Sequence, residues 1–283
     1  MDMREITCAE ISTAVSELFL RANRTISPDI RQAMAAAFSD EAEPAARYAL
    51  DQLLRNYECA AADGLPICQD TGMAVVFAEV GQDVHIIGGS FNDAIQNGVR
   101  EAYKDGLLRK SIVSDPLFDR KNTLDNSPAL IHTSIVPGDR LHLLAIAKGF
   151  GSENMSRIAM LPPSAGEKGI FDFIVDTVRI AGPNPCPPVV VGVGIGGDFE
   201  QAALMAKHAT ARPFSEHNAD ERYAALERRA FEAVNALGIG AAGYGGRTTA
   251  LNIAIEWAPT HIAGLPVAVN ICCHASRHAE VTL

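Results

Sequence analysis

Three cysteines lie where a loop meets an apolar run, a position at which rigid scaffolds often carry functional side chains. Cys68 occurs in "GLPICQDTG", Cys186 in "GPNPCPPVVVGVGIGG" and Cys273 in "PVAVNICCHASRH". Each is a candidate for a metal ligand, a nucleophile or a packed core thiol. Cys8 and Cys59 lie within helical patterns instead, and we interpret both as small buried hydrophobic residues.

The spacing of these cysteines distinguishes between kinds of metal site. Structural zinc sites usually have paired ligands a few residues apart, whereas here only Cys272, Cys273 and His274 lie close together. Cys272 and Cys273 point to opposite faces of an extended backbone, so only one of them can readily join a shared site, and the sequence leaves open which. A zinc-stabilised scaffold that includes Cys68 and Cys186 is an alternative, but three separated thiolates fit an iron–sulfur cluster better. A [4Fe–4S] cluster normally takes four cysteines, so one with three leaves an iron open to act as a Lewis acid on a substrate oxygen.

Two glycine-rich segments accompany the cysteines. Gly192, Gly194 and Gly197 satisfy the dinucleotide-binding pattern G-x-G-x-x-G between a predicted strand and a predicted helix. That fold also needs a second strand after the helix, but "ARPFSEHNADERYAALERR" contains no apolar run. We therefore favour a tight turn that presents backbone N–H groups beside Cys186, and keep a nucleotide-binding module using Gly192–Gly197 as a distant alternative. The other segment, "KGFGSENMSR", can bring backbone N–H groups to a carboxylate.

The composition describes a folded globular protein and restricts its partners. The 283 residues are 48% hydrophobic and 20% charged, and the net charge is −10. That charge excludes a broad surface for nucleic acid or for an anionic membrane, but it permits a small anionic substrate. We expect no secretory signal, because the N-terminus is too polar for one. We expect no transmembrane helix, because no apolar run is long enough to cross a membrane. We expect a cytoplasmic protein, in which six cysteines do not form a disulfide framework.

The periodicity of apolar residues predicts a mixed α/β (α+β) fold that would position these groups. We expect one domain over residues 1–283, in which a helical N-terminal part, residues 1–60, packs on β-sheet layers and the site lies at strand ends. Pro28 occupies the expected first turn of one helix. Further helices are predicted over 92–108, 169–182, 198–210 and 220–238, with Gly238 as the stop of the last. Strands are predicted over 73–80, 83–89, 129–135, 140–149, 187–197 and 264–273.

Five separated motifs occur in an order that resembles a known family. They are "PICQDTG", "KGFGSENMS", "NPCPPVVVGVGIGGDFE", "GYGGRTTALNIAIEWAPTHIAGLPVAVN" and "CHASRH". Together they resemble the iron–sulfur hydro-lyases of the class I fumarase and tartrate dehydratase family, and in particular its alpha subunit or N-terminal domain. The resemblance covers nearly the whole chain and is most specific over residues 64–278.

The resemblance implies a cofactor and a set of substrate-binding residues. It implies an oxygen-sensitive [4Fe–4S] cluster held by Cys68, Cys186 and Cys273, with Cys272 left as a packing residue. It also implies that Asp70 is an acid/base group and that Arg109 grips a substrate carboxylate, a task suited to a planar guanidinium. The implied catalytic and substrate-contacting residues are Gln69, Asp70, Arg109, Gly149, Gly151 and His261.

The resemblance also implies partners and a class of substrate. Long single-chain members carry a second domain that this sequence lacks, so we expect a separate beta subunit, together with an alpha–alpha dimer. The segments "GSENMS" and "GVGIGGDFE" resemble fumarase alpha chains more than tartrate dehydratase alpha chains. The first expectation is therefore reversible hydration of fumarate to (S)-malate. L(+)-tartrate dehydratase and mesaconate hydratase, which acts on a methylated fumarate, are the alternatives.

Overall fold

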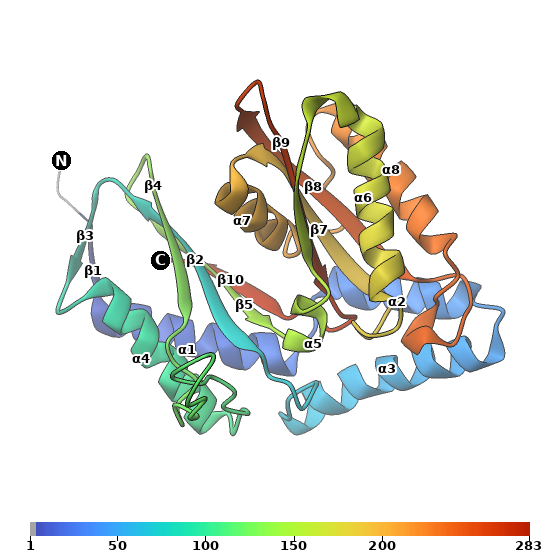
Figure 1. Cartoon of the computed structure of the whole chain (residues 1–283). Helices are drawn as coiled ribbons and strands as arrows, with labels where there is room; N and C mark the ends of the chain where they lie inside the picture. Colours follow the sequence, from blue (N-terminus) through green and yellow to red (C-terminus); the bar gives the residue numbers. More distant parts are fainter. Residues whose placement is uncertain (1–3) are drawn as a thin grey trace. The chain divides into compact units, whose positions relative to one another are not determined.

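The computed structural model describes residues 4–283 as helices and mixed sheets, which confirms the predicted mixed α/β class (Figure 1). Contacts divide the chain into two compact units. The first unit contains residues up to Ile26, Tyr57–Gly149 and Arg277–Leu283, and the second contains Ser27–Asn56 and Phe150–Ser276. None of the helices within residues 4–283 is long and apolar enough to cross a membrane.

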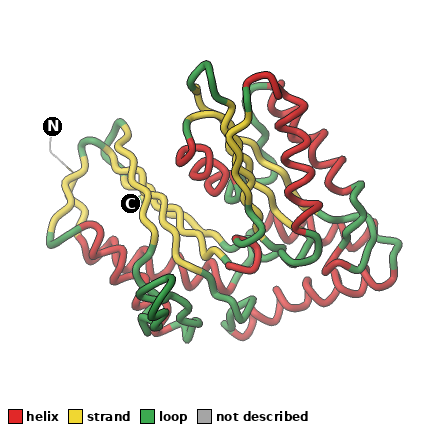
Figure 2. The backbone as a smooth tube through the Cα atoms, viewed as in Figure 1, coloured by secondary structure: helices red, strands yellow, loops and turns green. Residues whose placement is uncertain are grey.

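The first unit is a four-stranded sheet with two helices. The sheet has the strand order β10-β5-β2-β4, in which β2 and β4 are parallel and the other neighbours are antiparallel. A separate parallel pair joins β1 to β3. Between α4 and β4 the chain forms a long loop (Figure 2). The elements are β1 (Arg4–Thr7), α1 (Cys8–Arg24), β2 (Met73–Gly81), β3 (Val84–Ile87), α4 (Phe91–Asp105), β4 (Leu130–Val136), β5 (Leu141–Lys148) and β10 (His278–Thr282).

The two helices of the first unit bury their apolar stripes against one face of this sheet. Alternate residues of β2 and β5 join the apolar side chains of α1 and α4 in a single core. Thr7 begins α1 with a capping box, since its side chain and that of Glu10 each bond the other residue's backbone N–H. Gly98 lets α4 approach α1, because a Cβ atom there would lie 2.4 Å from the Ser12 carbonyl oxygen.

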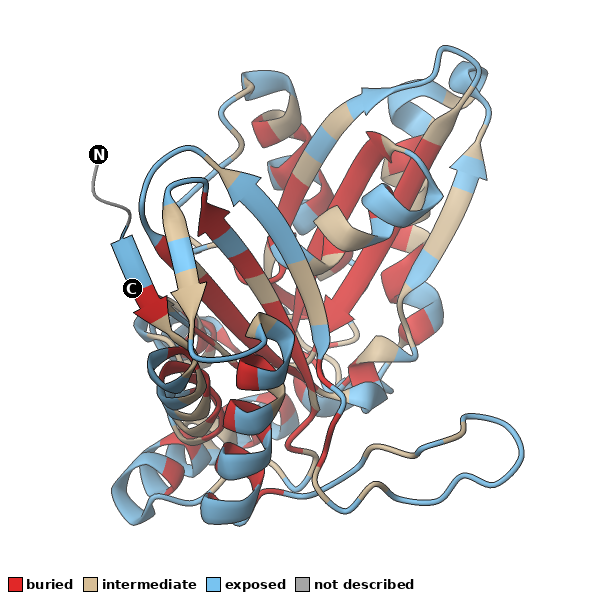
Figure 3. Cartoon of the chain, turned by 90° about the vertical axis from the view of Figure 1, so that its left-hand side faces the viewer, coloured by how far each residue is buried: buried red, intermediate tan, exposed pale blue. Residues whose placement is uncertain are grey.

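The second unit is a three-layer arrangement around the sheet β6-β9-β7-β8. Only β7 and β8 are parallel neighbours. Helix α7 contacts one face, α6 and α8 pack on the other, and β7 and β9 are buried along nearly their whole length (Figure 3). The elements are α2 (Pro28–Asp40), the start of α3 (Pro44–Asp63), α5 (Phe150–Glu153), β6 (Arg157–Leu161), η1 (Pro163–Ala165), α6 (Gly166–Ala181), β7 (Val189–Gly197), α7 (Phe199–Ala209), α8 (Glu221–Asn235), η2 (Ala241–Gly243), β8 (Ala250–Thr260) and β9 (Leu265–Cys272).

The glycines of the G-x-G-x-x-G pattern serve the packing of α7 on β7. A Cβ atom would lie 2.0 Å from the Ala206 carbonyl oxygen if added to Gly192, and 2.1 Å from that of Ala202 if added to Gly194. Both glycines therefore permit a close approach of helix and strand. The predicted turn beside Cys186 is wrong, because Gly192 and Gly194 lie within β7, and Gly197, the one glycine of the pattern with positive φ, ends this strand far from that cysteine.

Two further sequence interpretations need correction. Cys59 is exposed on α3, because it points away from the stripe that buries Tyr57 and Ala60. Of the two cysteines expected to be buried, only Cys8, which is half-buried, packs against a core. The sequence analysis also missed β1, β6, β8 and β10. Each of these strands has a neighbour on one side only. β1, β6 and β10 span only four or five residues each, too few for a clear alternation, whereas the apolar run of β8 was present in the sequence and was overlooked.

Candidate functional site

The segment that contains Cys68, Gln69 and Asp70 is a loop between α3 and β2 in the first unit. Its start is tied to α1, because the Ile67 N–H donates to the Asn23 carbonyl oxygen at 2.8 Å. Its end requires glycine. Gly72 has φ +82, and a Cβ atom there would lie 2.6 Å from the Ala147 carbonyl carbon of β5.

Two buried polar side chains hold the end of this loop through hydrogen bonds to its main-chain carbonyl oxygens. The Tyr103 hydroxyl of α4 lies 2.8 Å from the Thr71 carbonyl oxygen and 2.9 Å from that of Gly72. The Asn126 amide donates to the same Gly72 oxygen at 3.2 Å. Burial raises the pKa of Tyr103 far above its ordinary value. The hydroxyl therefore remains a hydrogen-bond donor at any pH at which the protein works.

The backbone of Asp70 is held by an arginine that the sequence analysis did not single out. Arg277 is 3% exposed, and its Nη1 donates to the Asp70 carbonyl oxygen and, at 3.4 Å, to Asn23 Oδ1. The Asp70 carboxylate is oriented separately, since its Oδ1 accepts from the Gly72 N–H at 3.0 Å. Arg277 could have been found from the sequence, because it is a charged residue within the motif "CHASRH".

Gly149 closes this arrangement, which we call the Asp70 cluster: Asp70, Gly149 and Arg277. A Cβ atom at Gly149 would lie 3.1 Å from Arg277 Nη2 and 3.4 Å from Asp70 Oδ2. A methyl group there would therefore crowd the Arg277 guanidinium and contact the Asp70 carboxylate. The adjoining Lys148 is 1% exposed, with its Nζ 3.4 Å from the Gly149 carbonyl oxygen.

Two other predicted site residues, Gln69 and Arg109, lie in or next to the same loop. Gln69 is exposed, and the Cys68 Sγ lies 3.9 Å from its Oε1. Arg109 is also exposed, and its carbonyl oxygen accepts from the Thr71 hydroxyl at 3.0 Å. The first unit thus places a thiol, an amide and a carboxylate on one short segment, which contacts the main chain of Arg109.

Cys186 and Cys273 lie side by side in the second unit. The His274 N–H donates to the Cys186 carbonyl oxygen at 3.4 Å. Cys186 is exposed, with φ +55, between buried prolines on both sides. Of the adjacent pair, Cys272 is 4% exposed and belongs to the core, while Cys273 is half-buried, with its Sγ 3.7 Å from the Ala275 carbonyl oxygen.

The donor set fits an iron–sulfur group. Cys68, Cys186 and Cys273 are all free of disulfide bonds, and none of them is fully buried. Thiolates are the protein ligands that hold such clusters. Cys68 belongs to the first unit and the other two cysteines to the second, and over residues 4–283 no three His, Cys, Asp or Glu side chains gather in a way that could hold a metal ion.

His261 lies at the opposite end of the second unit's sheet from Cys186 and Cys273. It follows β8 directly and is exposed, and its Nδ1 accepts from the Ala263 N–H at 3.2 Å. Thr260 pairs with Gly197, whereas Cys272 pairs with Val190 seven positions earlier on β7. At about 3.3 Å per residue this separates the two ends by roughly 23 Å. Within this unit the structure does not bring His261 together with the thiols.

Comparison with known proteins assigns the chain to a family. Residues 12–282 match the family described as fumarate hydratase (Fumerase). A protein of Methanocaldococcus jannaschii named putative L(+)-tartrate dehydratase subunit alpha is 38% identical over 279 residues, covering 95% of this chain and 96% of its own length. The L(+)-tartrate dehydratase subunit alpha of Escherichia coli strain UTI89 is 34% identical over 227 residues, covering 77% of this chain and 74% of its own. The chain belongs to the fumarate hydratase (Fumerase) family and is thus related to hydro-lyase alpha subunits.

Proposed function

We propose that the chain is the alpha subunit of a hydro-lyase that interconverts fumarate plus water and (S)-malate. The Asp70 cluster beside Cys68 is the observation that carries this proposal. The cluster combines a carboxylate of fixed orientation, two positions after Cys68 in the chain, with a glycine that leaves space in front of that carboxylate. The family match and the motif "GSENMS" support fumarate as the substrate.

In this proposal Cys68, Cys186 and Cys273 hold a [4Fe–4S] cluster. When bound, such a cluster supplies Lewis-acid stabilisation for the departing 2-hydroxyl group, which is otherwise a poor leaving group. The adjacency of Cys186 and Cys273 and the exposure of the Cys186 thiol support this role. Cys272 contributes packing only, consistent with its burial.

Asp70 moves the proton in the proposed reaction. Dehydration of malate removes a proton from C3, and hydration returns one there. The Gly72 N–H engages Asp70 Oδ1, so Oδ2 is the oxygen that faces the space kept open by Gly149. Arg277 holds the Asp70 main chain and thereby limits how far this oxygen can move.

Arg109 and Gln69 bind the substrate in this proposal. Both side chains are exposed, and both belong to segments tied to the Asp70 loop. The guanidinium of Arg109 suits bidentate recognition of one substrate carboxylate. Gly149 and Gly151 offer backbone groups to the same ligand.

His261 acts in this proposal at the site of a second copy of the chain. It lies at the far end of its own sheet from Cys186 and Cys273, so it cannot serve the thiols of its own unit. The expected alpha–alpha dimer would deliver it to the other copy. If mixing a His261→Ala chain with a Cys186→Ser chain restores part of the activity that each lacks alone, the proposal holds; absence of complementation contradicts it.

A separate beta subunit completes the proposed enzyme. The relatives named above carry the words subunit alpha in their names. The chain covers nearly the whole of the Methanocaldococcus jannaschii relative, so the likeness is to an entire alpha subunit. We therefore expect activity only after co-expression with a beta chain.

L(+)-tartrate dehydration is the second candidate, and the names of the relatives favour it. The two candidates share the same proton and hydroxide chemistry and differ in one substituent at C3. The test is anaerobic co-expression with a beta subunit, followed by assays on (S)-malate, L(+)-tartrate and a methylated malate. A kcat/KM that is highest for (S)-malate supports fumarate hydration, whereas activity on tartrate alone overturns it.

The cofactor is tested separately from the substrate. The purified chain is reconstituted anaerobically with iron and sulfide, and both elements are measured per chain. Cys68→Ser and Cys186→Ser should each lower the iron content, while Cys59→Ser, a change to an exposed thiol on α3, should not. Unchanged iron in the first two variants would remove the cluster from the proposal.

A further inference from the structure

The glycine-rich segment "AGYGGRTT", residues 242–249, lies in the second unit and has no role in the proposed chemistry. Its backbone is unusual, because Ala242, Gly243, Gly245 and Gly246 have φ values of +52, +80, +83 and +101. Glycine adopts such φ values readily, but Ala242 has a side chain, so surrounding contacts must hold its left-handed backbone. The contacts at the two ends of the segment therefore show what this loop does.

One end of the loop supports the segment that carries Cys186. The Ala242 N–H donates to the Pro187 carbonyl oxygen at 2.8 Å. Gly243 lies against Pro183 so closely that a Cβ atom there would approach the proline Cβ to 2.5 Å. Cys186 itself has a left-handed backbone, a conformation that is unfavourable for a residue with a side chain. The glycine-rich loop is thus one of the supports that keep Cys186 in this conformation.

The other end of the loop is held by a buried carboxylate. Glu41, between α2 and α3, is 3% exposed. Its Oε2 accepts from the Arg247 N–H at 2.8 Å, and its Oε1 accepts from the N–H groups of Ala42 and Glu43 at 3.0 and 2.9 Å. The carboxylate fits tightly over Gly246, where a Cβ atom would lie 2.6 Å from Oε2.

The Glu41 carboxylate remains charged in this buried place. Burial by itself would raise its pKa, but the backbone N–H groups of Glu43, Arg247, Ala42 and Thr248 outweigh it, and the pKa lies below the ordinary value. Hydrogen bonds to a charged acceptor are stronger than those between neutral groups. Glu41 therefore fastens residues 246–248 to the α2–α3 connection.

We infer that Glu41 is a positioning residue for Cys186, acting through the glycine-rich loop. The inference rests on the proposed function in one respect, namely that Cys186 is a cluster ligand. Glu41 fixes the C-terminal end of the loop, and the loop fixes Pro183 and Pro187 on either side of the thiol. Loss of the carboxylate should therefore make the backbone at Cys186 more mobile, although Glu41 does not act on Cys186 directly.

The first test measures amide hydrogen exchange in the cluster-free chain. Glu41→Gln keeps the volume of the side chain but removes its charge and replaces one acceptor oxygen with an NH₂ donor, which cannot accept from a backbone N–H group. Exchange of the Ala242, Arg247 and Thr248 amides should accelerate about tenfold or more, and the Cys186 amide should follow. If the loop amides accelerate while the Cys186 amide does not, the inference is overturned.

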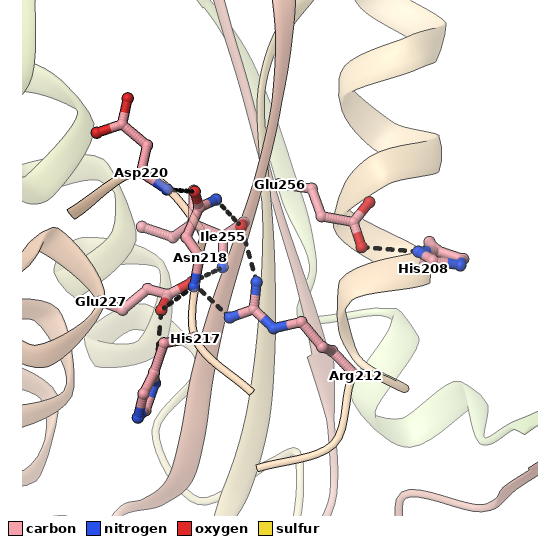
Figure 4. Close-up of polar contacts among 8 residues, drawn as sticks. All are labelled: His208, Arg212, His217, Asn218, Asp220, Glu227, Ile255 and Glu256. Carbon is pink, nitrogen blue, oxygen red and sulfur yellow. Dashed lines mark hydrogen bonds and ion pairs between the residues drawn. The ribbon is translucent and has the colours of Figure 1, made fainter. Parts of the chain in front are cut away.

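Glu227 provides a matched control in the same unit. It is 2% exposed and accepts from the Ile255 N–H at 2.7 Å and from Arg212 and Asn218 (Figure 4). Glu227→Gln removes a buried carboxylate of the same kind, whose partners Arg212, Asn218 and Ile255 all lie outside the Cys186 segment. It should leave the Cys186 amide unchanged; equal acceleration in both variants would mean general destabilisation and would contradict a specific role.

A second measurement reads the cluster itself. After anaerobic reconstitution, Glu41→Gln should retain less iron than the unmodified chain and lose the visible absorption of the cluster several-fold faster in air, whereas Glu227→Gln should match the unmodified chain. If Glu41→Gln does not fold, Glu41→Asp, which keeps the charge but shortens the side chain, tests the same contact. If Cys186→Ser retains full iron, the proposed function fails, but the exchange result still decides whether Glu41 positions this segment.

Discussion

The guanidinium of Arg277 donates a hydrogen bond to the main-chain carbonyl oxygen of Asp70, 207 positions earlier in the sequence. This contact ties the C-terminal segment to the loop that carries Cys68 and Asp70. Arg277 is also bound at its own backbone, because the Ala147 N–H of β5 donates to its carbonyl oxygen at 2.9 Å. The arginine therefore links the end of β5 to the orientation of the proposed acid/base group.

Replacing Arg277 should impair catalysis more than folding. Arg277→Ala frees the Asp70 backbone, and a displacement of about 1 Å at a reacting group can lower kcat/KM by about 10²-fold. Steady-state assays of the complex with its beta subunit measure this loss. Arg21→Ala is the matched control, since Arg21 donates to the Glu280 carbonyl oxygen at 2.6 Å in the same unit but away from Asp70. Equal losses in both variants would contradict a specific role for Arg277.

Gly149 should not tolerate a methyl group. In Gly149→Ala the new Cβ would lie 3.1 Å from Arg277 Nη2 and 3.4 Å from Asp70 Oδ2, so one of these groups must shift. We expect a loss of about 1–3 kcal/mol in the free energy of unfolding, measured with urea, together with reduced activity. Gly151→Ala has open space around its Cβ, so its free energy of unfolding should stay unchanged. A stable and fully active Gly149→Ala variant would rule out the crowding argument.

Tyr103 should contribute stability through its hydroxyl group rather than its ring. Tyr103→Phe keeps the ring near Phe19 but removes the donor that serves the Thr71 and Gly72 carbonyl oxygens. The expected cost is about 1–3 kcal/mol in the free energy of unfolding, because buried acceptors lose a partner. Tyr244→Phe, at a residue that is 63% exposed, should cost little. Similar urea midpoints for the two variants would refute this assignment.

Glu41 should make the second unit sensitive to acid. Its pKa in the folded chain is below 4.5, so the stabilisation is complete above that pH and is lost as the pH falls through the folded value. The charged groups nearby are Arg47, which donates to the Glu41 carbonyl oxygen, and Arg247, which donates to that of Asp40. Urea unfolding should therefore show a gap between the unmodified chain and Glu41→Gln at pH 7 that narrows below about pH 4.5; a constant gap would contradict the linkage.

Sequence reasoning reached those parts of the fold that are encoded locally. The apolar periodicity of α4, α6 and α8 and the buried runs of β5, β7 and β9 predicted those elements. The strands β6 and β10 were missed because five residues each show too little alternation of apolar and polar side chains. The role of Arg277 was missed for a related reason, since it exists only when the C-terminal segment returns to β5. Gly192 and Gly194 were wrongly assigned to a tight turn, because tight turns and close helix packing both favour glycine.

The neighbouring residues Cys272 and Cys273 offer an internal control for the proposed cluster. They differ in burial, since Cys272 is 4% exposed within the core at the end of β9 and Cys273 is half-buried next to the Cys186 segment. Cys273→Ser should therefore abolish most iron binding after reconstitution and change the free energy of unfolding of the cluster-free chain little. Cys272→Ser should keep its iron but lose about 1–2 kcal/mol, because a hydroxyl replaces a packed thiol. Iron analysis and urea unfolding on the same two preparations check both halves. If Cys272→Ser loses the iron instead, the ligand is the buried thiol, and the backbone at the end of β9 must rearrange when the cluster binds.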